Sequence, residues 1–440
     1  MRGAHHACRA SRAAWTSLEE VQIISREPAT PEEERGLTVP PDAGESRSTF
    51  REVFSVGEFR ALWAAQVLSV AGDQLARVAL TLLVFARTHS ALLAAVTFVA
   101  SVVPMFVGSV ALSGLADRLP RRRVMIACDL SRAALVAIMA LHGIPIAVMV
   151  CLLGVVTLIS GPFSSARAAL TADILSGDRY VLGVAVTLTT MQFAQVVGFA
   201  AGGAMVGFLG VRTSLLADAG TFVASAVIAR AWVGVRPPAR TERSGRTESL
   251  AEVTSGIRLV FGDRRLLIPM LLAWLSAFYN APEGVAAPLA QSLGGGDVAA
   301  GLILASGALG ATAGAIAFSR LVGPSERLRW MKPIAVVASG ALILFAVGPT
   351  LPVALIILCV SGIFACYQLA ANAQFVANTP PGQRSQAFGI AQGGLSLGQG
   401  TAMILAGAAA ERVSPSLVVA ASGAIGAGVA LVILLTPRAH

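Results

Sequence analysis

The chain has 440 residues, of which 55% are hydrophobic and only 13% are charged. Soluble domains average about 45–50% apolar and about 25% charged residues, so this composition excludes an ordinary soluble protein. The formal net charge is +9, but the basic residues lie between apolar segments instead of gathering in one soluble patch. The charge therefore does not indicate binding to nucleic acid.

Residues 1–56 combine arginines with acidic residues and lack an apolar segment behind a basic start. We therefore predict a disordered cytoplasmic tail and no cleaved signal peptide. From residue 57 onward, apolar runs alternate with short polar breaks, and each run is long enough to cross a hydrocarbon layer about 30 Å thick. The expected spans are 60–86, 90–116, 124–143, 146–166, 181–209, 213–233, 266–290, 298–319, 331–348, 352–376, 385–410 and 414–435.

Twelve spans predict an all-α polytopic membrane protein with both termini on one face. A long polar segment, 234–265, divides the spans into two six-helix bundles, residues 57–233 and 266–436. Within this segment, apolar residues recur at helical spacing at Leu250, Val253, Ile257 and Val260. They indicate a short amphipathic helix on the inner membrane face, with an ordinary solvated linker helix as the alternative.

The distribution of basic residues indicates the orientation, because Lys and Arg are retained on the cytoplasmic face. Basic residues gather in the loops 116–124 and 319–332 and in the segment 234–265. The loops on the other face carry only Arg87, Arg212 and Arg412. We therefore predict a multi-pass protein of the cell membrane with both termini in the cytoplasm.

The loop from Ser113 to Met125 reads SGLADRLPRRRVM and carries the clearest local motif. It resembles the signature of the major facilitator superfamily, which that family places between its second and third spans. The matching residues are Leu115, Ala116, Asp117, Arg118, Arg121 and Arg122. Two glycines of the signature are replaced, by Ser113 and Pro120. The resemblance implies the twelve-helix fold of that superfamily and transport by alternating access.

The same loop and the start of the next span are predicted to form a cytoplasmic gate. A carboxylate at a helix end, followed by arginines, can hold neighbouring helix ends together, and breaking these pairs would let the bundles rock apart. The candidate gate residues are Asp117, Arg118, Arg121, Arg122, Asp129 and Arg132. Asp129 and Arg132 lie one turn apart, so we expect them to pair with each other or to contact the Asp117 loop. A basic loop that only sets the orientation is the alternative.

Glycines are frequent in the fifth span, where they stand at Gly198, Gly202 and Gly203. The segment resembles a pattern associated with exporters of the superfamily, with Phe199 where that pattern has proline. The resemblance favours export over import. Close packing of helices through small residues is the alternative and would need no transport role.

Ionisable residues inside the spans are the best candidates for function, since such residues usually line a path or find a partner. Asp73 lies near the middle of the first span, with Arg77 one turn later, and Glu283 lies in the seventh span. We predict that Asp73 and Glu283 exchange a proton against the solute, with Arg77 beside them. A static ion pair between Asp73 and Arg77 is the alternative. Three weaker candidates complete the pathway: Asn280, Gln66 and Asp218.

Several other mechanisms are excluded by what the sequence lacks. The only lysine, Lys332, follows Met331, so there is no Walker A Gly-Lys pair and no ATP-driven motor in this chain. No histidine stands at the centre of a span, which argues against a zinc site or a histidine relay. We therefore expect no enzyme activity, no cofactor and no bound metal.

Across residues 57–436 the motifs follow in the order Leu62–Gln66, Gly72–Gln74, Asp117–Arg118, Asp129–Arg132 and Pro380–Arg384. This order resembles the bacterial exporters of siderophores and macrolides within the superfamily. The resemblance implies proton-driven efflux of a small, partly hydrophobic compound. The expected partners are that solute, protons and the lipid bilayer, without nucleic acid, and we expect a monomer. An uptake carrier or uniporter stays as one alternative, and a membrane sensor or scaffold that transports nothing stays as another.

Overall fold

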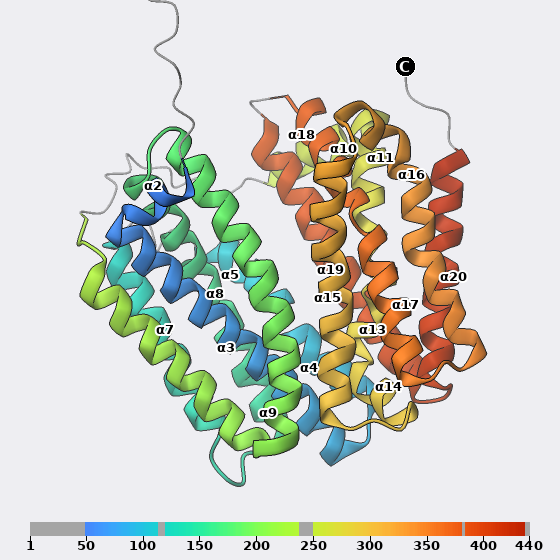
Figure 1. The fold of residues 1–440 in the computed structure, drawn as a ribbon, viewed down its shortest axis with the longest axis horizontal. Coiled ribbons are helices and arrows are strands. Elements are labelled where there is room, and N and C mark those ends of the chain that lie inside the picture. Colours follow the sequence, from blue (N-terminus) through green and yellow to red (C-terminus); the bar gives the residue numbers. More distant parts are fainter. Residues whose placement is uncertain (1–48, 113–118, 237–249, 381–382, 436–440) are drawn as a thin grey trace, which may run out of the picture. The chain divides into compact units, whose positions relative to one another are not determined.

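The computed structural model describes residues 49–112, 119–236, 250–380 and 383–435. Most of the predicted tail therefore lies outside the described residues, as do Asp117 and Arg118 of the signature loop. The residues from Thr49 onward form one compact unit. Its described part consists of helices joined by short connections (Figure 1).

The helices follow one another along the chain as α2 Phe50–Ser55, α3 Gly57–Thr88, α4 Ala91–Ala100, α5 Val103–Ala111, α7 Arg121–Met139, α8 Ile146–Ile174, α9 Asp178–Trp232, α10 Leu250–Gly262, α11 Arg264–Trp274, α12 Ser276–Tyr279, α13 Ala281–Gly284, α14 Ala286–Ser292, α15 Asp297–Leu321, α16 Pro324–Gly340, the 3-10 helix η1 Ala341–Val347, α17 Leu351–Phe364, α18 Tyr367–Asn378, α19 Arg384–Ala410 and α20 Pro415–Leu435. We call α3–α9 the N-terminal bundle and α11–α20 the C-terminal bundle. Figure 1 shows the two bundles side by side, blue to green and yellow to red.

Eight helical stretches among the described residues are long and apolar enough to cross a membrane. They carry nine of the twelve expected spans, because α9 contains both the fifth and the sixth. The remaining three expected spans correspond to α7, to the run of short helices α11–α14 and to α19. The all-α, multi-span architecture predicted from the sequence is confirmed.

The helix α9 turns back on itself at Gly210, whose φ of 79° and ψ of 164° are not helical. Glycine adopts this positive φ without the steric cost that a Cβ brings. The turn separates a first arm, 178–209, from a second arm, 211–232, which meet at the bottom of Figure 1. We call this end of the bundles the lower face; it also holds the starts of α4 and α15. The opposite end is the upper face.

Several of the expected spans are divided into shorter helices, and prolines stand at the breaks in the second and the seventh. The second span is interrupted between α4 and α5, where Pro104 stands at the start of α5. The seventh span is divided into α11, α12, α13 and α14, with Pro282 in α13 and Pro288 in α14. Proline lacks a backbone N–H and its ring clashes with the preceding turn, which favours a break at these positions, although α8 continues through Pro162. The freed backbone groups make both spans locally irregular.

The predicted helix in the linker is present as α10, and its packing is known from Gly256 onward. Val260 is fully buried and belongs to a cluster with Leu266, Met270 and Phe375. Gly256 lies against Ile390 of α19. The end of α10 therefore packs on the C-terminal bundle. The two alternatives considered from the sequence, a helix lying on the membrane and a solvated linker helix, did not include this packing.

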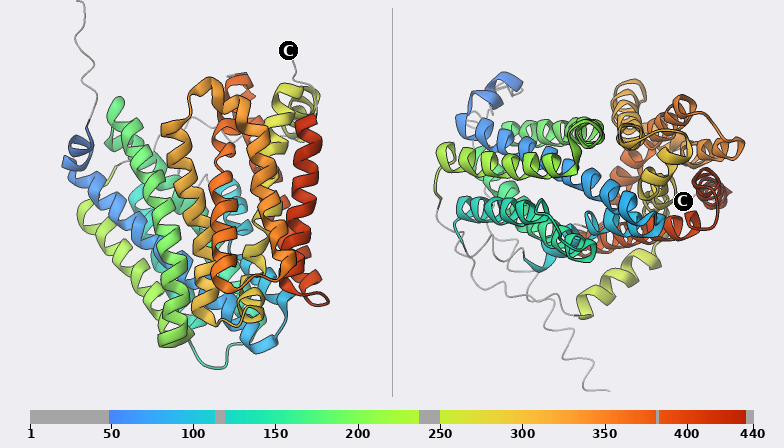
Figure 2. Two further views of the ribbon diagram at one scale, coloured as in Figure 1. Left: turned by 45° about the vertical axis from the view of Figure 1, so that its right-hand side comes forward. Right: turned by 90° about the horizontal axis from the view of Figure 1, so that it is seen from below.

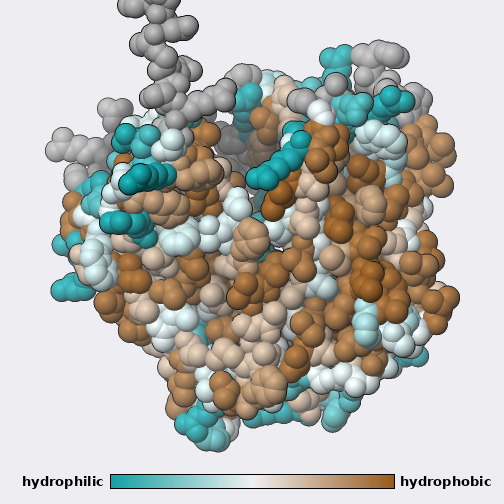
Figure 3. Space-filling view, viewed as in Figure 1, coloured by the Kyte–Doolittle hydropathy of each residue, from teal (hydrophilic) through white to brown (hydrophobic). Residues whose placement is uncertain are grey.

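The two bundles meet through α9 with α15 and through α4 with α19. One hydrophobic cluster runs through both, since it includes Phe199 of α9 together with Val285 and Leu304 of the C-terminal bundle. Figure 2 shows the bundles side by side in two further views. The surface in Figure 3 is mainly hydrophobic at mid-height and more hydrophilic near both faces, as expected for a protein surrounded by lipid, and it is hollowed near the upper face between the bundles.

Candidate functional site

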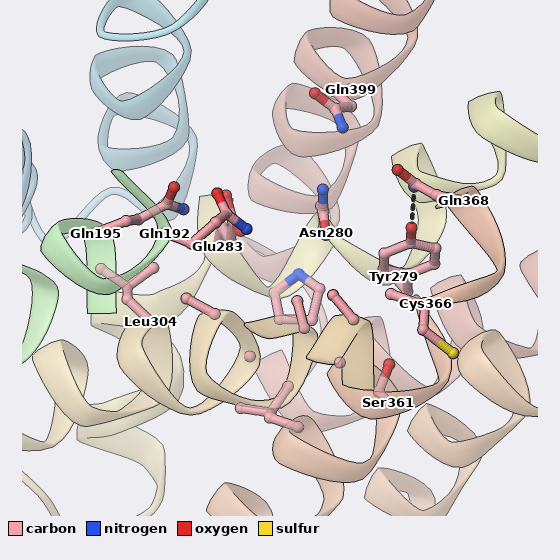
Figure 4. Close-up of a pocket in the computed structure, with 18 of the residues that line it drawn as sticks. Gln192, Gln195, Tyr279, Asn280, Glu283, Leu304, Ser361, Cys366, Gln368 and Gln399 are labelled. Carbon is pink, nitrogen blue, oxygen red and sulfur yellow. Dashed lines mark hydrogen bonds between the residues drawn. The ribbon is translucent and has the colours of Figure 1, made fainter. Parts of the chain in front are cut away.

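A cavity of about 270 Å³ lies between the first arm of α9 and the C-terminal bundle. Its walls come from α9, from the broken helix α12–α13, and from α15, α17, α18 and α19. Its polar lining consists of Gln192, Gln195, Tyr279, Asn280, Glu283, Ser361, Gln368 and Gln399. Small and aliphatic residues such as Leu304 and Gly307 line the rest (Figure 4). A mostly apolar cavity with a few converging polar groups is the usual form of a binding site for a small molecule.

Four glutamines give the cavity its hydrogen-bonding capacity, because each amide can donate and accept. Gln399 donates to the Ser276 hydroxyl at 3.0 Å, and Gln368 donates to the Tyr279 hydroxyl. Figure 4 shows Gln192 and Gln195 on one side of the cavity and Gln368 on the other. The amides therefore surround the space from both bundles. Sequence reasoning did not select these glutamines as site residues, although amides inside apolar spans were the available signal.

Glu283 is the one charged side chain among the described residues that line this cavity. It lies in the four-residue helix α13, and its backbone N–H donates to the Asn280 carbonyl at 3.0 Å. Its carboxylate interacts electrostatically with Arg77 of α3, in the other bundle. Two of the residues singled out in the sequence, Glu283 and Asn280, thus line the cavity, and Arg77 is not part of its lining.

Arg77 is held on three sides within the N-terminal bundle. Its Nη2 donates to the Ser101 carbonyl at 3.1 Å, which is the point where the second span breaks. Its guanidinium lies 5.5 Å from the centroid of the Phe98 ring and 6.0 Å from that of Phe199. These contacts fix a positive charge near the boundary between the bundles.

The alternative ion pair between Asp73 and Arg77 is wrong, because Asp73 pairs with a residue of another helix. Arg132 of α7 donates from Nη2 to Asp73 at 2.8 Å and from Nη1 to Asp129 at 3.3 Å. It also donates to the Ser69 hydroxyl at 3.1 Å, and Ser225 donates to the other Asp129 oxygen at 2.6 Å. The predicted pairing of Asp129 with Arg132 is confirmed. The pair also belongs to a deep cluster with Asp73.

Aromatic rings and burial complete the surroundings of this cluster. Arg132 and Asp129 are fully buried, whereas the Asp73 side chain is 30% accessible. The Phe222 ring lies over the Arg132 guanidinium at 3.9 Å from its centroid. The cluster therefore joins α3, α7 and the second arm of α9, with Asp73 as its accessible member.

Asp218 and Gln66 do not line the cavity. Asp218 is fully buried beside Gly72 and feels the charges of Asp73 and Arg132, and its Oδ2 has no hydrogen-bond partner among the described residues. Gln66 is buried against the first arm of α9, where its Nε2 contacts Met191 Sδ at 3.4 Å. Asp218 thus adjoins the Arg132 cluster, and Gln66 is separate from both groups.

The glycines of the fifth span pack closely against neighbouring helices. A Cβ built on Gly198 would lie 2.7 Å from Gln74 Cβ, and one on Gly202 would lie 3.1 Å from Val78 Cβ. Gly203 instead faces the other bundle, where its Cβ would lie 2.7 Å from the Gly301 Cα. These surroundings support close helix packing, which was the alternative interpretation of the three glycines.

The described part of the signature loop ties helix ends of the N-terminal bundle together. Arg121 forms an ion pair with Asp173 near the end of α8, and Arg122 donates to the Arg230 carbonyl near the end of α9. The predicted gate residues therefore fall into two places. Arg121 and Arg122 are at the upper face, whereas Asp129 and Arg132 belong to the deeper cluster.

Replacing Arg132 by leucine should destabilise the protein strongly. The change leaves Asp73 and Asp129 without their cation, and breaking one partner of a buried pair costs about 3–5 kcal/mol. Thermal unfolding in detergent measures the effect as a lowered midpoint. The exposed Arg320→Leu is the matched control and should leave the midpoint near that of the parent. Equal midpoints for the two variants would contradict the account of the cluster.

Two helical bundles built from membrane-spanning helices, with a cavity between them that carries converging polar groups, define a polytopic membrane carrier. The family model described as Major Facilitator Superfamily matches residues 62–362 and 284–440, and the chain belongs to that superfamily. It is 26% identical over 363 residues to the "Multidrug efflux pump Tap" of Mycolicibacterium fortuitum, covering 79% of this chain and 88% of that protein.

Solved structures give the same fold. A POT family transporter in complex with 5-aminolevulinic acid superposes with a TM-score of 0.68 at 10% identity, covering 87% of this chain and 98% of that one. A D-xylose-proton symporter superposes with a TM-score of 0.65 at 14% identity, covering 86% and 98%. The superfamily predicted from the signature loop is confirmed, and the chain is a multi-pass membrane transporter of a small molecule.

Proposed function

We propose that this protein is a proton-driven exporter of small, partly hydrophobic compounds that works by alternating access. The cavity between the bundles holds the solute, and Glu283 in its wall exchanges a proton against it. Asp73, the accessible carboxylate of the Arg132 cluster, is the second candidate for a proton. The termini lie in the cytoplasm, so the upper face is the inner one.

The position of Glu283 is the observation that carries the proposal. It is a carboxylate that lines the cavity and interacts electrostatically with Arg77, which is held in the other bundle. Protonation of Glu283 neutralises its charge and removes this charge–charge attraction, so that proton uptake and the relative position of the bundles become linked. The cavity beside Glu283 also supports a carrier over a sensor or scaffold, whose acids would be sealed by protein.

Export is supported by the multidrug efflux pump among the relatives, and by the apolar walls of the cavity, which suit a partly hydrophobic solute. The rival is an uptake carrier with the same fold. The polar lining supports a solute that forms hydrogen bonds, because each amide of the lining can donate to the solute and accept from it.

Transport by reconstituted vesicles tests the proposal. A resistance and accumulation screen in a strain without its own exporters first selects the solute from macrolides, hydroxamate siderophores and ethidium. Vesicles that are acidic inside should then accumulate this solute while protons leave, at a saturable rate that collapses when an ionophore removes the gradient. Protein-free vesicles correct for passive partition.

Each rival function has its own outcome in the same assay. Accumulation only with the acid side outside identifies a symporter and removes the export claim. Movement that is indifferent to the gradient removes the proton claim and identifies a uniporter. Absence of any saturable flux for all three solute classes would favour a protein that transports nothing.

A further inference from the structure

The two bundles are joined at the lower face by a carboxylate that no sequence motif drew attention to. Glu411 directly follows α19 of the C-terminal bundle. Its Oε1 accepts a hydrogen bond from the Ser90 hydroxyl at 2.7 Å and another from the Leu92 N–H at 2.9 Å. Ser90 is the N-cap of α4, so a side chain of one bundle caps a helix of the other.

The start of α4 is well suited to bind a carboxylate. The first N–H groups of a helix have no partner within the helix, and the helix dipole favours a negative charge there. The Ser90 hydroxyl oxygen accepts from the Leu93 N–H at 3.1 Å, and Glu411 accepts from the preceding N–H, that of Leu92. Serine and glutamate therefore share the cap, which is complete only when the bundles are together at this face.

Neighbouring contacts at the lower face are of a different kind. Gly407 lies so close to α4 that a Cβ there would be 2.6 Å from Ala95 Cβ, and Gly203 packs on Gly301. These contacts are van der Waals contacts between small residues, and such contacts have no preferred direction. The bonds of Glu411 add a fixed direction and a fixed partner to this packing.

Glu411 is exposed to solvent, so its hydrogen bonds to α4 are weak enough to break and re-form during a conformational change. The Leu92 N–H and the Ser90 hydroxyl hold the pKa of Glu411 below its ordinary value. Since the lowered pKa belongs to the closed state, the stabilisation is present at neutral pH and is lost only as the pH falls through the acidic range of the carboxyl group. Exposed charge contacts are weak, so thermal motion breaks this one readily.

We propose that Glu411 is a latch that holds the cavity closed at the lower face and must release α4 in every transport cycle. The latch rests on the proposed alternating access. It acts on the position of the bundles and touches neither the solute nor the proton site, so Glu411 is a positioning residue. Its loss raises the population that is open at the lower face.

The native thiol of Cys366, which lines the cavity, reports on opening without any knowledge of the solute. In a full-length variant whose other four cysteines are serine, a membrane-impermeant maleimide is added from the lower face, outside the cell in the proposed orientation. Glu411→Ala should label Cys366 about fivefold faster than the parent. Glu411→Gln, which keeps an acceptor oxygen, should restore most of the protection.

The adjacent exposed Arg412→Ala is the matched control and should label at the parental rate. Transport measured on the same proteins should show an altered maximal rate with an unchanged KM, because solute contacts are not affected. Equal labelling of Glu411→Ala and the parent would overturn the latch. Faster labelling in a protein that moves no protons would leave the latch intact and reject only the proposed function.

A cross-link gives a second test that does not depend on loss of a side chain. A disulfide between Ser90→Cys and Glu411→Cys should stop transport, and reduction should restore it. Continued transport by the cross-linked protein would show that this contact need not open, which also overturns the proposal.

Discussion

Glu283→Gln is expected to reduce transport driven by a pH gradient to the rate measured without a gradient. Glutamine keeps the shape of the side chain and an acceptor oxygen but cannot take up or release a proton. It also removes the charge that faces Arg77 across the bundle boundary. The measurement is solute accumulation by acidic vesicles, with proton release followed in the same sample.

The matched control for Glu283→Gln is Gln195→Leu, which alters the cavity wall at a residue that does not titrate in the working range. It should weaken solute binding and raise KM while leaving the response to the gradient in place. Both variants should reach the membrane in parental amounts. Gradient-driven accumulation at the parental rate by Glu283→Gln would refute the assignment of this carboxylate.

Gly203→Val is expected to abolish transport by keeping the bundles apart at the lower face. A Cβ at this position would lie 2.7 Å from the Gly301 Cα and 2.8 Å from the Asp297 carbonyl oxygen. Both are backbone atoms, so no flexible side chain can move aside, and the first arm of α9 cannot approach α15. Vesicle transport measures the loss, and the Cys366 thiol should become more accessible from the lower face.

Gly220→Val, in the second arm of α9, separates this effect from the general cost of valine in a helix. No atom lies within 4 Å of a Cβ built on Gly220, so the substitution meets open space. It should retain transport close to that of the parent. If the two variants were equally active, the contact between Gly203 and Gly301 would not be needed for closure.

The helical architecture could be predicted because hydropathy is a local property of the sequence. The turn at Gly210 falls between the expected spans 181–209 and 213–233, and the glycine there is the residue that a positive φ favours. The breaks in the seventh span were also encoded locally, by Pro282 and Pro288, but a hydropathy count treats such a segment as one helix.

The partners of the charged residues could not be obtained in this way. Arg77 is one turn from Asp73 and was the natural partner along the chain, yet Asp73 pairs with Arg132, which is 59 residues away. The outcome depends on how α7 packs against α3, and no local pattern contains that information. Arg77 instead donates from Nη2 to the carbonyl that becomes available where the second span breaks, while its Nε has no hydrogen-bond partner among the described residues.

The polar lining of the cavity was missed for the same reason. Gln192, Gln368 and Gln399 stand in three separate helices, and each one taken alone resembles an amide that bonds to a neighbouring helix. Glu283 and Asn280 could be selected because a charge and an amide so close together in one span are rare. Their neighbours became evident only when the helices were assembled.

The division of the seventh span into α11–α14 has a consequence for the range of cargo. A long helix moves as a rigid rod, whereas we expect four-residue segments such as α12 and α13 to shift separately at their joints while the long helices around them stay in place. A wall made of such pieces conforms to molecules of different outline with little elastic cost. We therefore expect selection by size to be loose and the pattern of amides to decide what is carried.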